Sequence, residues 1–125
     1  MSLDILIVED EFLIALDLQM EVEALGHVVL GPARDGESAR AVLSETRPDM
    51  AFMDIRLAGG DSGIDVAKWL YDTHGVRCIF MSGNLDQQVM DAAAEFEPYG
   101  FLGKPVFMNQ VGPLLDYVQT TIDAR

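Results

Sequence analysis

The sequence predicts an α/β fold in which five short parallel strands alternate with five helices. Short apolar runs and amphipathic stretches alternate five times along the 125 residues. The first run, Ile5–Val8, has four consecutive aliphatic residues, which is typical of a strand buried on both faces. Alternating strands and helices require right-handed crossovers, and these give a parallel sheet covered by helices on both sides.

Each strand is expected at a short apolar run that ends in turn or charged residues. After Ile5–Val8, the expected strands are His27–Leu30, Met50–Met53, Cys78–Met81 and Phe101–Leu102. Gly31 and Pro32 are expected to end the second strand. Five such units fit the flavodoxin-like order 2-1-3-4-5, in which ligands bind at the carboxyl ends of the strands, beside strands one and three.

The helices are expected where apolar residues recur at helical spacing. These ranges are 11–25, 35–47, 64–74, 85–96 and 109–122, and residues 57–63 form a glycine-rich loop. Asp35 is expected to cap the second helix and Asn109 the last one. Gly112 and Pro113 then fall in the first turn of the last helix, where proline is tolerated.

The composition indicates one globular domain, and we expect residues 1–125 to form it without an output domain. Eight Lys and Arg against 21 Asp and Glu give a net charge of −13. Such a surface repels nucleic-acid phosphates and anionic lipid, which argues against direct DNA or membrane binding. No apolar run approaches the roughly 20 residues that span a bilayer.

The amino terminus and the cysteine usage predict a cytoplasmic location. The first residues lack the basic and apolar segments of a signal peptide. Cys78 is the only cysteine, so it cannot form an internal disulfide, and it lies in an expected buried strand. A reducing compartment fits this pattern.

Polar side chains follow four of the five expected strands. Glu9 and Asp10 follow the first, Asp54 the third, Ser82 the fourth and Lys104 the fifth. Because the carboxyl ends of parallel strands share one edge, we expect these side chains to converge. Crowded carboxylates repel one another unless a divalent cation lies among them. The sequence therefore predicts a magnesium site with a reactive aspartate.

Phosphoryl transfer to an aspartate is the chemistry that uses this set. Asp54 is the expected nucleophile, Asp10 a direct Mg²⁺ ligand, and Glu9 a ligand either directly or through water. Lys104 would balance one phosphoryl oxygen and Ser82 would donate a hydrogen bond to another. Taken alone, Asp10 could instead cap the following helix and Ser82 could open a turn.

Taken together, these residues resemble the receiver domain of bacterial two-component response regulators. The match in order and spacing comprises Glu9-Asp10, Asp54, Ser82, Phe101 and Lys104-Pro105, and it extends over essentially the whole chain. The resemblance implies that Asp54 accepts a phosphoryl group from a sensor histidine kinase or a histidine phosphotransfer protein. It also implies a cis peptide bond before Pro105.

The same resemblance implies a conformational switch. Phosphorylation would draw Ser82 toward the phosphoryl group and let Phe101 turn inward, which alters the surface of the fourth helix, fifth strand and fifth helix. That surface would bind an unknown protein target, with the chain a monomer or a phosphorylation-dependent dimer. Arg56 and Asn84 occupy positions that tune the phosphoryl lifetime, and the Arg56 backbone carbonyl is the expected third Mg²⁺ ligand.

Three other functions are less well matched. A phosphatase of the haloacid dehalogenase type needs a second aspartate where this chain has Arg56. A flavin-binding electron carrier needs a Ser-, Thr- and Gly-rich phosphate loop, whereas Glu9-Asp10-Glu11 repels phosphate. A receiver-like binding module regulated without phosphate would not need the complete set of site residues. We therefore expect no enzyme activity beyond the chain's own phosphorylation and slow autodephosphorylation.

Overall fold

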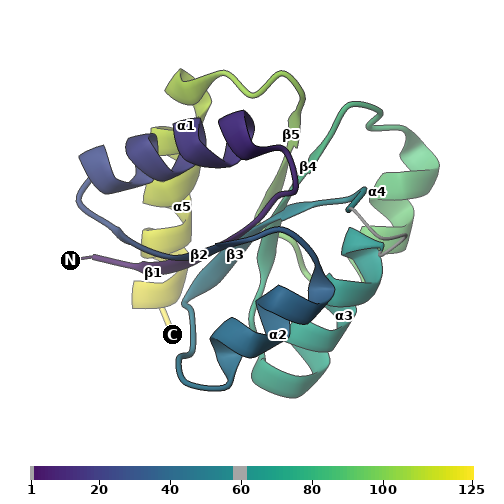
Figure 1. Ribbon diagram of the computed structural model, residues 1–125, viewed down its shortest axis with the longest axis horizontal. Coiled ribbons are helices and arrows are strands. Elements are labelled where there is room, and N and C mark those ends of the chain that lie inside the picture. Colours follow the sequence, from purple (N-terminus) through teal and green to yellow (C-terminus); the bar gives the residue numbers. More distant parts are fainter. Residues whose placement is uncertain (1, 58–61) are drawn as a thin grey trace.

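Five parallel strands form one sheet in the computed structural model, in the order β2-β1-β3-β4-β5 (Figure 1). The structure describes residues 2–57 and 62–125. The strands are β1 (Asp4–Val8), β2 (Val28–Ala33), β3 (Met50–Asp54), β4 (Cys78–Ser82) and β5 (Gly100–Gly103). The predicted fold class and strand order are confirmed.

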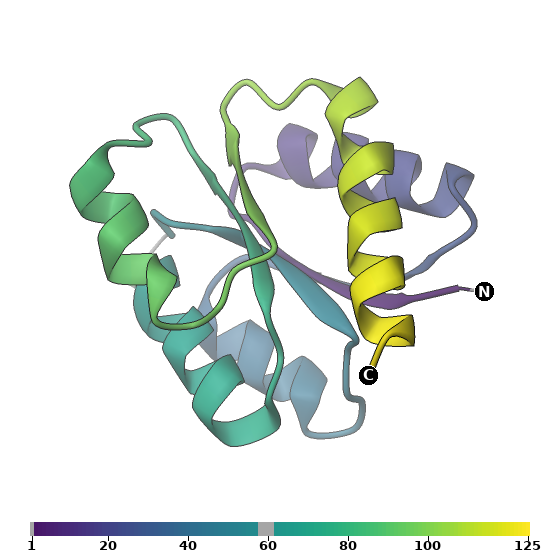
Figure 2. The same cartoon turned by 180° about the vertical axis from the view of Figure 1, so that it is seen from behind.

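Helices cover both faces of the sheet (Figures 1 and 2). One face carries α1 (Phe12–Ala24) and α5 (Val111–Asp123), and the other carries α2 (Gly36–Leu43), α3 (Gly63–His74) and α4 (Gln87–Ala94). A short 3₁₀ turn, η2 (Met108–Gln110), precedes α5. Within the described residues, no helix has the length and apolar content that a membrane crossing requires.

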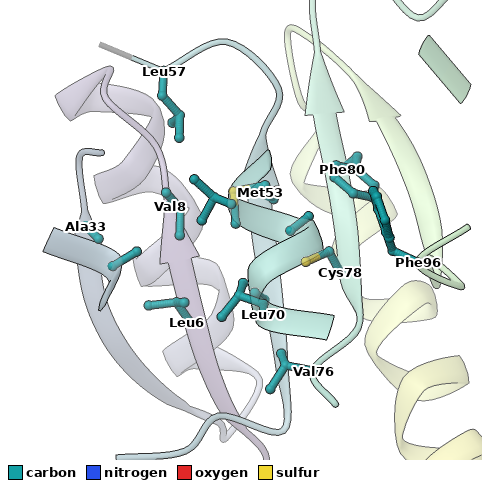
Figure 3. Close-up of a cluster of buried hydrophobic side chains, with 14 of the residues drawn as sticks. Leu6, Val8, Ala33, Met53, Leu57, Leu70, Val76, Cys78, Phe80 and Phe96 are labelled. Carbon is teal, nitrogen blue, oxygen red and sulfur yellow. The ribbon is translucent and has the colours of Figure 1, made fainter. Parts of the chain in front are cut away.

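The core consists of two apolar layers, one on each face of the sheet. Along β1, Ile5 and Ile7 join the cluster under α1 and α5, whereas Leu6 and Val8 join the cluster under α2, α3 and α4. Figure 3 shows the second cluster. This alternation follows from the period of two residues in a strand, and burial of both faces explains why residues 5–8 of β1 and 50–53 of β3 are all apolar.

Strand β2 is longer than the sequence predicts. The expectation that Gly31 and Pro32 end the strand is wrong, because β2 continues through both of them to Ala33. The pairing register with β1 shifts here, so that Val8 lies opposite Ala33, and the Ala33 carbonyl accepts a hydrogen bond from Glu9 N at 2.8 Å. An edge strand tolerates a residue that lacks an N–H, and β2 is an edge strand.

Helix α2 begins where predicted and ends early. Asp35 caps it, as expected, by accepting a hydrogen bond from Ser38 N at 2.8 Å. The helix stops at Leu43, four residues before the predicted end. The Ser44 hydroxyl donates to the Ala41 carbonyl at 2.7 Å and so satisfies a terminal carbonyl without a further helical turn.

The start of α5 corrects another prediction. Asn109 is not the cap of this helix, because it lies within η2, and Gln110 takes the cap position without a side-chain bond. The turn forms because Gln110 N donates to the Phe107 carbonyl at 2.9 Å. Gly112 and Pro113 do lie in the first turn of α5, as predicted. The boundaries of α1, α3 and α4 fall within two residues of the expected ones.

Candidate functional site

Three acidic side chains meet where β1 and β3 end. Glu9 and Asp10 directly follow β1, and Asp54 is the last residue of β3, its neighbour in the sheet. One carboxylate oxygen from each of the three lies within 4.8 Å of the others. The structure therefore brings together the acids that the sequence places after neighbouring strands.

Lys104 enters the same site from the end of β5. Its Nζ lies 3.0 Å from Asp54 Oδ2 and 2.6 Å from Glu9 Oε1. The backbone N of Lys104 donates to the Ser82 carbonyl at 2.9 Å, which ties this residue to the end of β4. The peptide bond before Pro105 is cis, as the resemblance implied.

A cavity of about 320 Å³ opens beside Asp54. Ser82 is buried, and its Oγ accepts a hydrogen bond from Asn84 N at 3.0 Å, so Ser82 opens a turn as well as facing this cavity. Arg56 N donates to Asp54 Oδ1 at 3.2 Å. The cavity is lined by Glu11, Asp54, Arg56, Ser82, Gly83, Asn84 and Lys104.

The electrostatics of the site follow from burial. Glu9 is only 2% exposed, and burial raises its pKa to about 7, with the neighbouring Asp54 acting in the same direction. Burial alone would lower the pKa of Lys104, but its contacts with the carboxylates of Glu9 and Asp54 outweigh burial and raise that pKa. Lys104 is therefore held as a cation, and it offsets part of the acidic charge.

The donor set suits a hard divalent cation. Carboxylate oxygens are the ligands that Mg²⁺ prefers, and it retains waters, so few protein ligands suffice. Asp10 is available, because it does not cap α1: the cap position belongs to Glu11, which makes no side-chain cap bond. The Arg56 carbonyl remains a predicted ligand. Residues 58–61 of the expected glycine-rich loop lie outside the described residues.

The aromatic residue of the proposed switch lies close to Ser82 in the sheet. Phe101 is half-buried and stacks on Phe80, with ring centroids 5.8 Å apart. Phe101 lies opposite Phe80, and Gly103 lies opposite Ser82. Because strand residues alternate between faces, Phe101 and Ser82 project from the same face of the sheet. A rearrangement at one residue could thus reach the other.

The outward face of α1 was missed by the sequence reasoning, which followed only the inward stripe. Phe12 and Leu13 are 75% and 72% exposed, and Leu16 and Met20 are also exposed. The spacing of Phe12, Leu16 and Met20 was a readable signal of a second apolar stripe. This face borders a cavity of about 350 Å³ that is lined by Glu9, Asp10, Phe12, Ala15, Leu16, Gln19, Pro32 and Arg34.

Residues 5–115 match the response regulator receiver domain family. Among curated proteins, the phyllosphere-induced regulator PhyR of Methylorubrum extorquens is 47% identical over 83 residues, which cover 66% of this chain and 31% of PhyR. The transcriptional regulatory protein PdtaR of Mycobacterium tuberculosis is 26% identical over 90% of this chain and 54% of PdtaR. The chain thus spans from about a third to about half of the length of these relatives.

Solved structures give the same assignment. The signal receiver domain of a modulated diguanylate cyclase from Desulfovibrio desulfuricans superposes over 100% of both chains, with a TM-score of 0.87 and 30% identity. The response regulator PhyR from Brucella abortus superposes over 99% of this chain and 50% of its own, with a TM-score of 0.84 and 29% identity.

Proposed function

Because the chain belongs to the response regulator receiver domain family, we propose that it is a phosphorylatable switch in which Asp54 accepts the phosphoryl group. One observation carries this proposal. The Asp54 carboxylate contacts the Lys104 ammonium, adjoins the carboxylates of Glu9 and Asp10, and faces a cavity. This combines a nucleophile, a cation and candidate metal ligands around one open space.

In the proposed reaction, an Asp54 carboxylate oxygen forms a bond to phosphorus as the bond from phosphorus to the donor's imidazole nitrogen breaks. Lys104 holds its ammonium against the developing charge on one phosphoryl oxygen. The Ser82 hydroxyl donates a hydrogen bond to another. Mg²⁺ held by Glu9, Asp10 and Asp54, with the Arg56 carbonyl, would supply further charge neutralisation. The chain acts on no other substrate, and Arg56 and Asn84 set the rate of its slow autodephosphorylation.

The proposed donor is a sensor histidine kinase or a histidine phosphotransfer protein, in the cytoplasm. The exposed apolar face of α1 supports a protein donor, because apolar surface beside a polar site is typical of a docking surface. Phe12 and Leu16 line the cavity that shares Glu9 and Asp10 with the acid site. A donor docked there would hold its phosphoryl group near Asp54.

The proposed output is a change on the face formed by α4, β5 and α5. A two-state switch exchanges an inactive and an active conformation. Moving the ratio of active to inactive molecules from 1:99 to 99:1 takes about 5.5 kcal/mol of differential stabilisation. Two hydrogen bonds to the charged phosphoryl group, from Ser82 and Lys104, would contribute about 1.5–3 kcal/mol each. The target we propose is a protein, since the charge of −13 disfavours DNA. A solved PhyR from Bartonella quintana is an anti-anti-sigma factor by name, which also favours a protein target.

Phosphorylation with a small donor tests the proposal. Incubation with Mg²⁺ and acetyl phosphate should add one base-labile phosphoryl group, seen as a mass increase. Asp54→Asn should abolish the increase. Asp49→Asn is the matched control, because Asp49 directly precedes β3, at the opposite end from Asp54, and should behave as wild type. A phosphoryl group that persists in Asp54→Asn would refute the assignment.

A further inference from the structure

Glu11 is an acidic residue at the cavity rim for which the reaction above has no role. It occupies the cap position of α1 but makes no side-chain cap bond. Its side chain instead lines the cavity beside Asp54, with Oε1 4.0 Å from Lys104 Nζ, and is 61% exposed. Its backbone N donates to Glu9 Oε2 at 3.1 Å, which fixes the start of the helix next to the acid site.

Holding Lys104 in place is not the main role of Glu11. Lys104 Nζ is already 2.6 Å from Glu9 and 3.0 Å from Asp54, and both of these acids are buried. The contact with Glu11 is the longest of the three and the only one to an exposed acid. It adds little to an ammonium group that two closer carboxylates already position.

The charge balance of the cavity gives Glu11 a larger effect. Among the described residues that line it, the acids Glu11 and Asp54 stand against the cations Arg56 and Lys104. Glu9 and Asp10 would be offset by a bound divalent cation. Removing Glu11 alone therefore leaves an excess of positive charge on the path to Asp54, and an approaching anion responds to that excess.

We propose that Glu11 sets the phosphodonor specificity of the site by repelling small anionic donors. This inference rests on the proposed function. A small donor such as acetyl phosphate has only its charged phosphoryl group with which to bind, so the Glu11 carboxylate slows its entry. A protein donor meets the same repulsion but also contacts the apolar face of α1, which begins at the adjacent Phe12. That contact offsets the repulsion, so Glu11 favours protein donors.

The test compares rates of phosphorylation by acetyl phosphate at saturating Mg²⁺ and low ionic strength. Glu11→Gln should react roughly 3–10-fold faster than wild type, because one repulsive charge is removed from the rim. Glu23→Gln is the matched control: it makes the same change in net charge at the other end of α1 and should react at the wild-type rate. The gain should shrink with added salt, since the Debye length falls from about 30 Å at 0.01 M to about 3 Å at 1 M.

A second donor separates this role from others. The gain in rate should be smaller with phosphoramidate, which carries less negative charge at neutral pH. Loss of the Glu11 carboxylate also weakens the attraction of the site for Mg²⁺, so the rates are compared with Mg²⁺ saturating for each protein. Equal rates in all three proteins, or an equal gain in Glu23→Gln, would overturn the inference and leave the proposed function intact. If wild type acquired no phosphoryl group on Asp54, the proposed function would fail and the inference with it.

Discussion

Among single residues, Glu9 makes the metal-free protein sensitive to pH. Burial raises its pKa from 4.5 to about 7, so the folded state binds this proton more tightly than the unfolded chain. The resulting stabilisation is fully present below about pH 4.5 and is lost as the pH rises through about 7. Glu9→Gln cannot ionise. Between about pH 5 and 8, the free energy of unfolding of this variant should rise relative to that of wild type by up to about 3 kcal/mol. Urea unfolding with a chelator present measures this difference.

The exposed Glu23→Gln variant provides the baseline for that measurement. It makes the same change in net charge at an exposed position of α1, and so controls for the loss of one negative charge. If the difference in unfolding free energy between Glu9→Gln and wild type did not change between about pH 5 and 8, the raised pKa of Glu9 would be contradicted.

The sequence could predict which residues form the site, because position after a strand decides it. Glu9, Asp54 and Lys104 each follow or end a short apolar run, and parallel pairing then brings them together. The sequence could not predict that Glu9 is the closest partner of Lys104, or that Glu11 turns toward the cavity instead of capping its helix. Both depend on side-chain conformations that only the packed structure determines.

Among the elements, the start of α3 is fitted against the end of β3. A Cβ atom at Gly63 would lie 1.8 Å from the Asp54 carbonyl oxygen and 2.8 Å from Ile55 Cα. Gly63→Ala must therefore displace the backbone that carries Asp54. We expect the free energy of unfolding, measured with urea, to fall by about 1–3 kcal/mol, and phosphorylation of Asp54 to be slower. Gly83→Ala, whose Cβ would meet nothing within 4 Å, should stay within about 0.5 kcal/mol of wild type. Equal effects at both glycines would contradict this explanation.

The outward face of α1 should contribute to donor binding without contributing to stability, because only the opposite face of the helix packs in the core. Phe12 is largely exposed, so the free energy of unfolding of Phe12→Ser, measured with urea, should lie within about 0.5 kcal/mol of the wild-type value. It should slow phosphoryl transfer from a phosphorylated histidine protein and leave the rate with acetyl phosphate unchanged. Val28→Ser, an exposed apolar change at the start of β2, is the control that should affect neither rate. Equal slowing with both kinds of donor would place Phe12 in the chemistry instead of in docking.

Element boundaries were predictable where a helix propensity or a cap decided them. Asp35 is one such residue, because its short carboxylate and the Ser38 partner form a local motif. The prediction failed where a neighbouring strand or a hydroxyl group decided the boundary. Strand β2 passes through Pro32 because it lies at the sheet edge, and Ser44 ends α2 by bonding back to a carbonyl. Neither effect is visible in the periodicity of apolar residues.

For the whole molecule, the alternation of strands and helices was enough to predict the topology, because right-handed crossovers leave few arrangements. The surface was not predictable in the same way. Among the described residues, most of the large exposed apolar side chains lie on α1 and the residues after it, whereas the sequence predicted a partner surface on α4, β5 and α5. We therefore propose two surfaces, a permanent one beside the site for the donor and a switched one for the target.

The net charge of −13 predicts how the whole molecule responds to ions. Sodium chloride should raise the melting temperature by screening self-repulsion, since the Debye length is about 10 Å at 0.1 M. Magnesium chloride at equal ionic strength should raise it further, because binding to the folded state alone adds about 1.4 kcal/mol when Mg²⁺ is present at ten times its dissociation constant. Asp10→Ala should keep the response to sodium and lose the additional response to magnesium. Equal responses to the two salts in wild type would show that the carboxylates of Glu9, Asp10 and Asp54 do not share an ion, even though their oxygens lie within 4.8 Å of one another.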